Sequence, residues 1–401
     1  MRPLDLVIIF GYLAGITLFG VWFSRKQRTT RDYFLGDRTV PWWAIAASIV
    51  ATETSTVTFI SVPGVAFARG GNFQFLQLVL GYMLGRVVIS LLFIPSYFRG
   101  ELLTVYQLLE RRFGSRAKML AAALFVVMRN IADGVRLLLT AIVLAAVYQS
   151  FQPQADLTTV TVASVVLLGA VMIVFTYFGG IEAVIWVEVV QLGIYLLGAL
   201  AAAVVLVSMI DGGFSGALAL GREFGKLDVF DFTFDLTKTY TFWAGLIGGC
   251  FLTMSTHGTD QYLVQRYLCT DRPRRAAAAL RSSGAVVLAQ FIGFLFIGVL
   301  LFAFYGPHRD PASATLAAGT ATLPLEGAFQ PVNTDRVFPD FITKHMPSGL
   351  SGLVVAAIFA AALSSSLNSI AATAVNDLYK PFRPRRDDRH YLKVSRWLTL
   401  G

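Results

Sequence analysis

The chain has 401 residues, of which 56% are hydrophobic and only 14% are charged, and its mean hydropathy is +0.65. Soluble globular domains carry about 25% charged residues, so this composition argues against a secreted enzyme, a cytosolic α/β enzyme and a nucleic-acid-binding protein. The two cysteines, Cys250 and Cys269, provide neither a disulfide framework nor metal-ligand spacing. The composition is that of a polytopic membrane protein.

Apolar runs of roughly the 20 residues needed to cross a bilayer recur along the chain. The first run leads into basic residues without a small-residue cleavage site, which predicts a retained helix rather than a signal peptide. In chain order the predicted spans are 3–23, 42–67, 73–97, 119–148, 158–178, 181–210, 240–263, 285–305 and 350–375. The final letters, YLKVSRWLTLG, have the pattern of a further span that is cut off, so we expect a C-terminally truncated sequence.

Basic residues are concentrated in alternate loops. The loops 24–38, 99–118, 179–182, 266–281 and 377–396 hold 22 Lys and Arg against 9 Asp and Glu, whereas the opposite set holds 8 against 11. The positive-inside rule then places the first set in the cytoplasm and the N-terminus outside the cell. The net charge of +9 therefore indicates orientation in a membrane rather than nucleic-acid binding.

Several ionisable residues fall inside the predicted spans. Each costs at least about 2.5–3.5 kcal/mol at the bilayer centre, so such residues usually face the interior of the bundle and mark a path or a site. The set is Glu53, Arg86, Arg129, Asp133, Arg136, Glu188 and Asp260. We expect Arg86 and Asp260 to lie near span ends as interfacial anchors.

Arg129, Asp133 and Arg136 are spaced i, i+4 and i+7, which places them on one stripe of a helix. The stripe either forms an internal salt-bridge network or leaves one guanidinium free to bind an anionic group of a solute. Instead of Asp133, Glu53 could be the counter-charge for an arginine of this stripe. Glu188, in an apolar span, must be protonated or have a cation beside it, which favours a cation pathway over a structural hydrogen bond.

Two predicted spans contain polar residues and helix breakers at membrane depth. The second span has a hydroxyl-rich centre around Thr54 followed by Pro63, and the seventh has Gly248–Gly249 and then Ser255, Thr256, His257 and Gly258. Paired interruptions of this kind are typical of transporters with inverted repeats, in which the site lies at the breaks. Taken singly, the hydroxyls of either span could instead bond carbonyls of their own helix. His257 is either a proton carrier or a hydrogen-bonded wall of the site.

Motifs for ATP hydrolysis and for hydrolase chemistry are absent from the sequence. A membrane-embedded enzyme built on His257 and Asp260 would lack a nucleophile and a metal. We therefore predict no catalytic residues.

Four separated blocks resemble the sodium/solute symporter family: RDYFLGDRTVPWW with the interrupted helix after it, YFGGIEAVIWVEVVQ, GTDQYLVQRYL and SSLNSIAATAVNDLYKP. The resemblance implies an all-α membrane fold with two inverted five-helix repeats and Na⁺-coupled uptake of a small polar solute. It divides a single transporter domain into an extra N-terminal helix at 3–23, a first repeat at 42–210 and an incomplete second repeat at 240–401.

The resemblance also implies a sodium site between the first broken helix and the eighth core helix. The family motif places its carbonyl ligands at Ala51 and Thr54 and its hydroxyl ligands at Ser364 and Ser365. Two alignments of the hydroxyl pair are open, and they differ in whether the main site or a second site survives. Glu188 stands where the family usually has Asp, which implies an ion-release or second-site role.

The solute site implied by the resemblance is that of sialic-acid-transporting members. Their pocket matches Ser55, Thr58, Phe73, Gln77 and Arg129, where the arginine would hold a carboxylate. Arg136 on the stripe, and Thr256 and His257 at the second interruption, complete the predicted set. The solute is then a carboxylate-bearing compound such as a sialic acid, or else a neutral sugar, polyol or amino acid.

The sequence therefore predicts a multi-pass symporter of the cell inner (plasma) membrane that binds Na⁺ and a small solute, contacts lipid, needs no organic cofactor and requires no oligomer. One alternative is a transporter-like sensor module of a larger signalling protein. Another is an H⁺-coupled transporter of the same fold that uses Glu53, Glu188 or His257.

Overall fold

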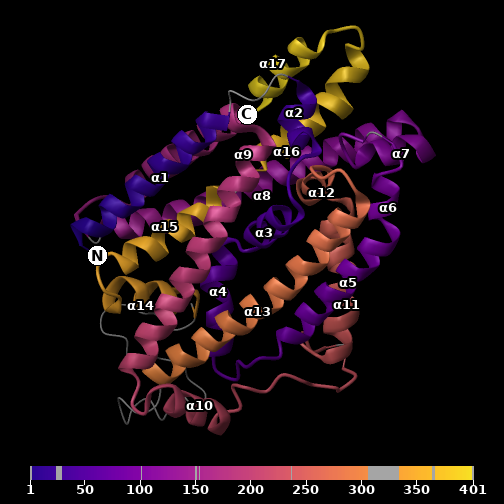
Figure 1. Cartoon of the computed structure of the whole chain (residues 1–401). Coiled ribbons are helices and arrows are strands. Elements are labelled where there is room, and N and C mark those ends of the chain that lie inside the picture. Colours follow the sequence, from indigo (N-terminus) through magenta and orange to yellow (C-terminus); the bar gives the residue numbers. More distant parts are fainter. Residues whose placement is uncertain are drawn as a thin grey trace.

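The computed structural model describes residues 2–23, 29–100, 102–149, 151–152, 154–235, 237–305, 334–363 and 366–399, and the regular elements in these ranges are helical (Figure 1). The first half of the chain forms α1 (Pro3–Phe23), α2 (Thr30–Leu35), η2 (Gly36–Arg38), α3 (Trp42–Glu53), α4 (Thr56–Phe67), α5 (Leu76–Leu92), α6 (Ile94–Tyr97), α7 (Tyr106–Phe113), α8 (Ser115–Gln149) and α9 (Leu157–Met209). The second half forms α10 (Gly213–Glu223), α11 (Phe242–Thr259), α12 (Gln261–Leu268), α13 (Pro273–Tyr305), η4 (Thr334–Arg336), α14 (Val337–His345), α15 (Leu350–Leu363), α16 (Leu367–Thr373), η5 (Ala374–Tyr379), η6 (Lys380–Phe382) and α17 (Asp388–Leu398).

Four helical stretches in the described ranges are long and apolar enough to cross a membrane, and the bent pair α3/α4 is a fifth candidate. The four are Ser115–Gln149, Leu157–Val174, Thr176–Met209 and Pro273–Tyr305. The outer face of α8 exposes large apolar side chains at Leu120, Leu124, Met128 and Ile131. Because their spacing follows the helical period, they form one lipid-facing stripe. Among the other predicted spans, α1 has the bounds expected from the sequence.

The bent helix lies in the middle of the molecule. Figure 1 shows α3 and α4 between α9 and α13, with α1 and α15 beside α9 and with α5 and α11 packed together beyond α13. The bend between α3 and α4 is 61°. The predicted interruption of the second span is therefore present. The two spans predicted at 158–178 and 181–210 also divide as expected, because Gly180 (φ 61°, ψ −168°) breaks the helical geometry of α9.

The predicted place of the second interruption is wrong. Helix α11 continues through Gly248–Gly249 and through Ser255 to Thr259, and the chain leaves helical geometry only at Asp260 (φ −84°, ψ 119°). The hydroxyls bond their own helix, since Thr256 donates to the Leu252 carbonyl (3.1 Å) and Thr259 to the Ser255 carbonyl (2.8 Å). The structure thus agrees with the alternative interpretation of the seventh span, in which its hydroxyls bond carbonyls of their own helix.

The glycines of α11 serve helix packing rather than unwinding. Gly245 and Gly249 lie against the backbone of α5, where a Cβ on Gly249 would come within 3.1 Å of the Gly81 Cα and closer still to the Leu78 carbonyl oxygen. A Cβ on Gly248 would meet nothing within 4 Å, because this residue faces outward. The pattern is that of membrane helices that approach closely through small residues.

We therefore expect Gly249→Ala to destabilise the protein and Gly248→Ala to leave it unchanged or slightly more stable. Overpacking a close helix contact costs about 1–3 kcal/mol, whereas Ala in a helix interior is favoured over Gly by roughly 0.5–1 kcal/mol. Thermal unfolding of the purified variants in detergent measures both effects. Equal unfolding temperatures for the two variants would contradict the packing.

Candidate functional site

Local side-chain hydrogen bonds hold the break between α3 and α4. The Thr54 hydroxyl donates to the Val50 carbonyl (2.7 Å), and Gln290 of α13 donates through Nε2 to that hydroxyl (2.8 Å). Ser55 then begins α4, because its hydroxyl accepts from the Thr58 amide (3.3 Å). The Ser55 hydroxyl thus replaces the carbonyl that the Thr58 amide would bond in a continuous helix, and Gln290 holds the Thr54 side chain in place.

The break changes the surroundings of the predicted carbonyl ligands. In a continuous helix the Ser55 amide would bond the Ala51 carbonyl, but here it donates to the Glu53 carbonyl (2.9 Å). Thr54 itself has non-helical angles (φ −77°, ψ 74°). The break therefore releases the Ala51 carbonyl from its helical hydrogen bond. The predicted hydroxyl ligands Ser364 and Ser365 lie outside the described residues.

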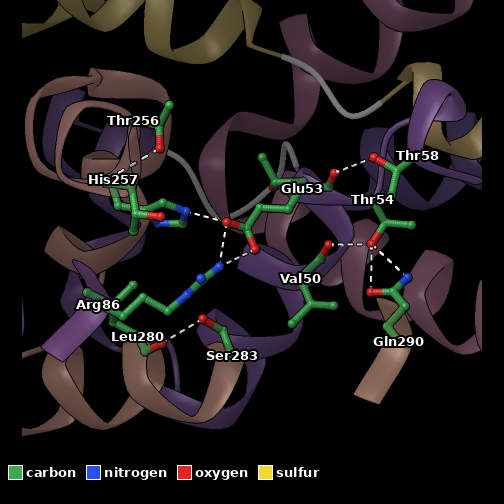
Figure 2. Close-up of polar contacts among 12 residues, drawn as sticks. Val50, Glu53, Thr54, Thr58, Arg86, Thr256, His257, Leu280, Ser283 and Gln290 are labelled. Atoms are coloured by element: carbon green, nitrogen blue, oxygen red, sulfur yellow. Dashed lines mark hydrogen bonds and ion pairs between the residues drawn. The ribbon is translucent and has the colours of Figure 1, made fainter. Parts of the chain in front are cut away.

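Glu53 connects the break to two other helices. Its carboxylate pairs with Arg86 of α5 and with Nε2 of His257 on α11 (Figure 2). On the other side of the ring, His257 Nδ1 lies 2.7 Å from the Tyr267 hydroxyl. Arg86 and His257 are each only 1% exposed. The expectation that Arg86 is an interfacial anchor is thus wrong, because its guanidinium neutralises Glu53 inside the bundle. For the same reason Glu53 is not the counter-charge of Arg129.

The charged stripe on α8 faces a second cluster of residues. Arg129 lies 3.4 Å from Asp133 and 3.9 Å from Asp260, and its guanidinium stacks over the Tyr262 ring at 3.8 Å. Asp260 also begins α12 by accepting from the Tyr262 amide (2.8 Å), so it is not an interfacial anchor. Among the described groups, Nε of Arg129 and Nη1 of Arg136 are buried without a hydrogen-bond partner or an ion pair. The stripe is an ion-pair network that keeps free donors.

These elements line an open cavity of about 480 Å³, within the usual range for small-molecule sites. The predicted solute residues that line it are Ser55, Thr58, Arg129, Arg136, Thr256 and His257. Its wall also includes residues that sequence reasoning missed, namely Tyr82, Tyr262, Leu263 and Phe291. Aromatic residues in apolar spans carry no local signal that separates a cavity wall from ordinary core packing.

Two predicted solute residues lie elsewhere. Gln77 is fully buried and holds the segment before α11, because its Nε2 donates to the Tyr240 carbonyl (3.3 Å) and its Oε1 accepts from the Asp231 amide (2.9 Å). Phe73 packs in the largest hydrophobic cluster. Neither is among the residues that line the cavity in this structure. A match of spacing along a sequence does not show which face of a helix a residue occupies.

The cation expected beside Glu188 is a guanidinium. Arg266 of α12 forms a fully buried ion pair with Glu188, and the carboxylate also accepts from the hydroxyls of Ser48 and Thr52 on α3. Arg266 was assigned to a cytoplasmic loop by its position among basic residues. The signal that could have identified it is the carboxylate itself, which needs a positive partner when both are buried.

Arg266→Met should therefore destabilise the protein strongly, by about 3–5 kcal/mol, because it leaves Glu188 buried and unpaired. Adding Glu188→Gln to the same protein should recover a large part of that loss, since the uncompensated charge is removed. Thermal unfolding of the two single variants and the double variant provides the double-mutant cycle. If the stability lost in the double variant equals the sum of the losses in the two single variants, the two side chains do not act as a pair.

A bent helix that releases a backbone carbonyl beside a charged cavity, in a bundle of apolar helices, is the arrangement of a secondary transporter. Comparison with known proteins gives the family. The model of the sodium:solute symporter family matches residues 33–400, and the chain belongs to this family. The family inferred from the sequence motifs is confirmed.

Characterised relatives share the whole length of the chain. The sodium/sialic acid symporter NanT of Aliivibrio fischeri is 30% identical over 99% of this chain and 74% of that protein. The sodium/sialic acid symporter SiaT of Proteus mirabilis is 31% identical over 94% of this chain and 71% of that protein. The human sodium/iodide cotransporter is 28% identical over 96% of this chain and 57% of that protein.

Solved structures agree with these relatives. The structure of a Na⁺-coupled sialic acid symporter in a substrate-bound, outward-open state, described as having a novel Na⁺ site, matches with a TM-score of 0.83 and 29% identity. The match covers all of this chain and 78% of that one. The protein is thus an all-helical membrane symporter that uses Na⁺ to move a small solute, and its relatives are transporters rather than enzymes.

Proposed function

We propose that the solute carries a carboxylate and that it binds in the cavity between α4, α8 and α11. The observation that supports this is the set of buried, unpartnered N–H groups on Arg129 and Arg136, both of which line the cavity. A planar guanidinium is suited to hold a carboxylate through two hydrogen bonds. Ser55 and Thr58 place hydroxyls on the same cavity for the remaining polar groups of the solute.

The charge balance of the cavity supports joint binding of an anion and Na⁺. Arg86, Arg129 and Arg136 face the carboxylates of Glu53, Asp133 and Asp260, so the charges of these six side chains balance. A carboxylate bound alone would leave one negative charge in a site of low dielectric constant, which is costly. A bound Na⁺ would cancel that charge. The two ligands would then favour each other's binding, which is the basis of coupling.

The proposed sodium site uses the Ala51 and Thr54 carbonyls with the Ser364 and Ser365 hydroxyls. The break supports the first half of this set, because it releases the Ala51 carbonyl at a fully buried position. Na⁺ is a hard cation that takes oxygen ligands. Glu188 is left out of the proposed site, since Arg266 already neutralises it.

We further propose the family arrangement of one extra helix at 3–23 followed by a first five-helix repeat at 42–210, with residues 240–401 forming part of the second repeat. The location is the cell inner membrane with the N-terminus outside, as the unequal distribution of Lys and Arg among the loops indicates.

The first experiment measures uptake into proteoliposomes under an inward Na⁺ gradient. Sialic acid is the first solute to test, because NanT, SiaT and the similar solved structure are described as sialic acid symporters. We expect that Na⁺ stimulates uptake. We also expect that added monocarboxylates inhibit this uptake more strongly than added neutral sugars do. Uptake that ignores Na⁺ and follows a pH gradient would contradict the proposal and assign coupling to the Glu53–His257 pair.

Arg136→Gln should weaken solute binding about 10- to 100-fold, because a hydrogen bond to a charged group contributes roughly 1.5–3 kcal/mol. The loss should nearly disappear for an analogue of the solute in which an amide replaces the carboxylate. Arg281→Gln is the matched control, since this arginine is exposed on α13 away from the cavity. Equilibrium binding to purified protein in saturating Na⁺ gives the affinity of each variant for the solute and for its amide analogue. An equal loss for acid and amide would rule out Arg136 as the carboxylate ligand.

A further inference from the structure

A row of buried oxygen atoms without hydrogen-bond partners follows one face of α16 and η5. Ser366, Ser369, Thr373 and Asp377 are each at most 1% exposed. The structure provides no hydrogen-bond partner, among the residues it describes, for the hydroxyls of the first three or for either carboxylate oxygen of Asp377. Their spacing of i, i+3, i+7 and i+11 keeps them on one face of a helix.

The neighbouring polar residues of the same helix behave differently. Asn368 accepts from Gln265 Nε2 (2.7 Å), and Asn376 donates to the Ala372 carbonyl (2.8 Å) and accepts from Lys380 (2.8 Å). These two asparagines, which lie on other faces of the helix, therefore have hydrogen-bond partners. Buried polar groups in native proteins nearly always find partners, so a row of exceptions calls for an explanation.

The cations near Asp377 have other partners. Lys118 pairs with Glu110 at 2.7 Å, and Lys380 bonds Asn376 and lies over the Tyr391 ring. Thr104, in the segment before α7, lies close enough to lower the pKa of Asp377, yet its hydroxyl also lacks a partner among the described groups. Burial is the larger effect and raises the pKa of this carboxyl to about 7. The end of the row is therefore a buried carboxyl beside a hydroxyl, and the nearby lysines are engaged elsewhere.

Two further features mark this segment. Asp377 lies within η5, which is a π-helix, and short π-helical segments occur frequently at functional sites. The row also has a direction. It begins at the residue after the two serines predicted to bind Na⁺, and it ends in the loop that the basic residues place in the cytoplasm. At 1.5 Å per residue its length is about 16 Å, roughly half the hydrocarbon core.

We propose that the face formed by Ser366, Ser369, Thr373 and Asp377 is the route by which Na⁺ leaves for the cytoplasm, with Asp377 and Thr104 as the last binding position. In this structure the oxygens are buried and unpartnered among the described residues. When the cytoplasmic side opens, water and the passing cation supply the missing interactions. Hydroxyl and carboxylate oxygens are the ligands that a hard cation takes, and Ser366 to Thr373 carry no charge that would trap it. The proposal rests on the Na⁺ coupling of the preceding subsection.

The test separates binding from release. In proteoliposomes, Asp377→Asn should slow the entry of radioactive Na⁺ with sialic acid about tenfold or more, because the last position loses its charge. In detergent, the Na⁺ concentration that half-saturates solute binding should stay within about twofold, since the row begins beyond the binding site. Ser369→Ala and Thr373→Val, tested singly, should each slow entry by a smaller factor.

Ser395→Ala is the matched control, because this serine is also fully buried but its hydroxyl bonds the Tyr391 carbonyl (2.7 Å). The proposal is overturned if entry is unchanged in the three row variants, if binding and entry fall in parallel, or if the control slows entry as much as Asp377→Asn does. Na⁺-independent uptake by the unaltered protein would instead overturn the proposed function. The two failures are therefore distinguishable.

Discussion

The structure depends on one constraint: an interrupted helix in a membrane must find partners for its freed backbone groups, because lipid offers none. At the break those partners are hydroxyls, because Ser55 Oγ accepts from the Thr58 amide and the Thr58 hydroxyl donates to the Glu53 carbonyl. Gln290 holds the Thr54 side chain. The helix can therefore bend by 61° at the centre of the bundle. The cavity and the proposed sodium site both lie where this bend exposes polar backbone and side chains.

Two buried polar contacts join the first broken helix to the second. Glu53 at the end of α3 bonds His257 near the end of α11, and the pair of Glu188 with Arg266 of α12 is bonded to Ser48 of α3. The two contacts lie on opposite sides of the break at Asp260. Because moving Arg266 away from the buried carboxylate of Glu188 would leave an uncompensated charge, separating α12 from α3 and α9 would be costly. The two broken helices are thus expected to move as one unit.

The sequence was informative wherever a local pattern decides the structure. Apolar length located α1, hydroxyls with Pro63 located the first break, and the short loop predicted at 179–182 lies where Gly180 divides two spans. The errors arose where the deciding contact is distant in sequence. Gly248 and Gly249 looked like a helix interruption, but the backbone of α5 beside Gly249 explains why small residues stand there.

Charged residues show the same limit. The sequence showed that Glu53 and Glu188 lie at membrane depth, but Arg86 looked interfacial and Arg266 looked cytoplasmic. Only the packing of α5 and α12 brings each arginine to its carboxylate. Likewise, spacing alone could not decide whether Gln77 lines the cavity or anchors the segment before α11, as it does in the structure.

Coupling follows from the sharing of one short segment by two ligands. In the proposed site Na⁺ would bind the carbonyls of Ala51 and Thr54, while Ser55 and Thr58, next along the chain, line the solute cavity. The ion would replace helical hydrogen bonds that the break has removed, and so would fix the start of α4. A solute bound to hydroxyls in a fixed orientation loses less entropy than one bound to a segment that fluctuates. Each ligand would thus increase the affinity for the other even without direct contact, and the charge balance of the cavity acts in the same direction.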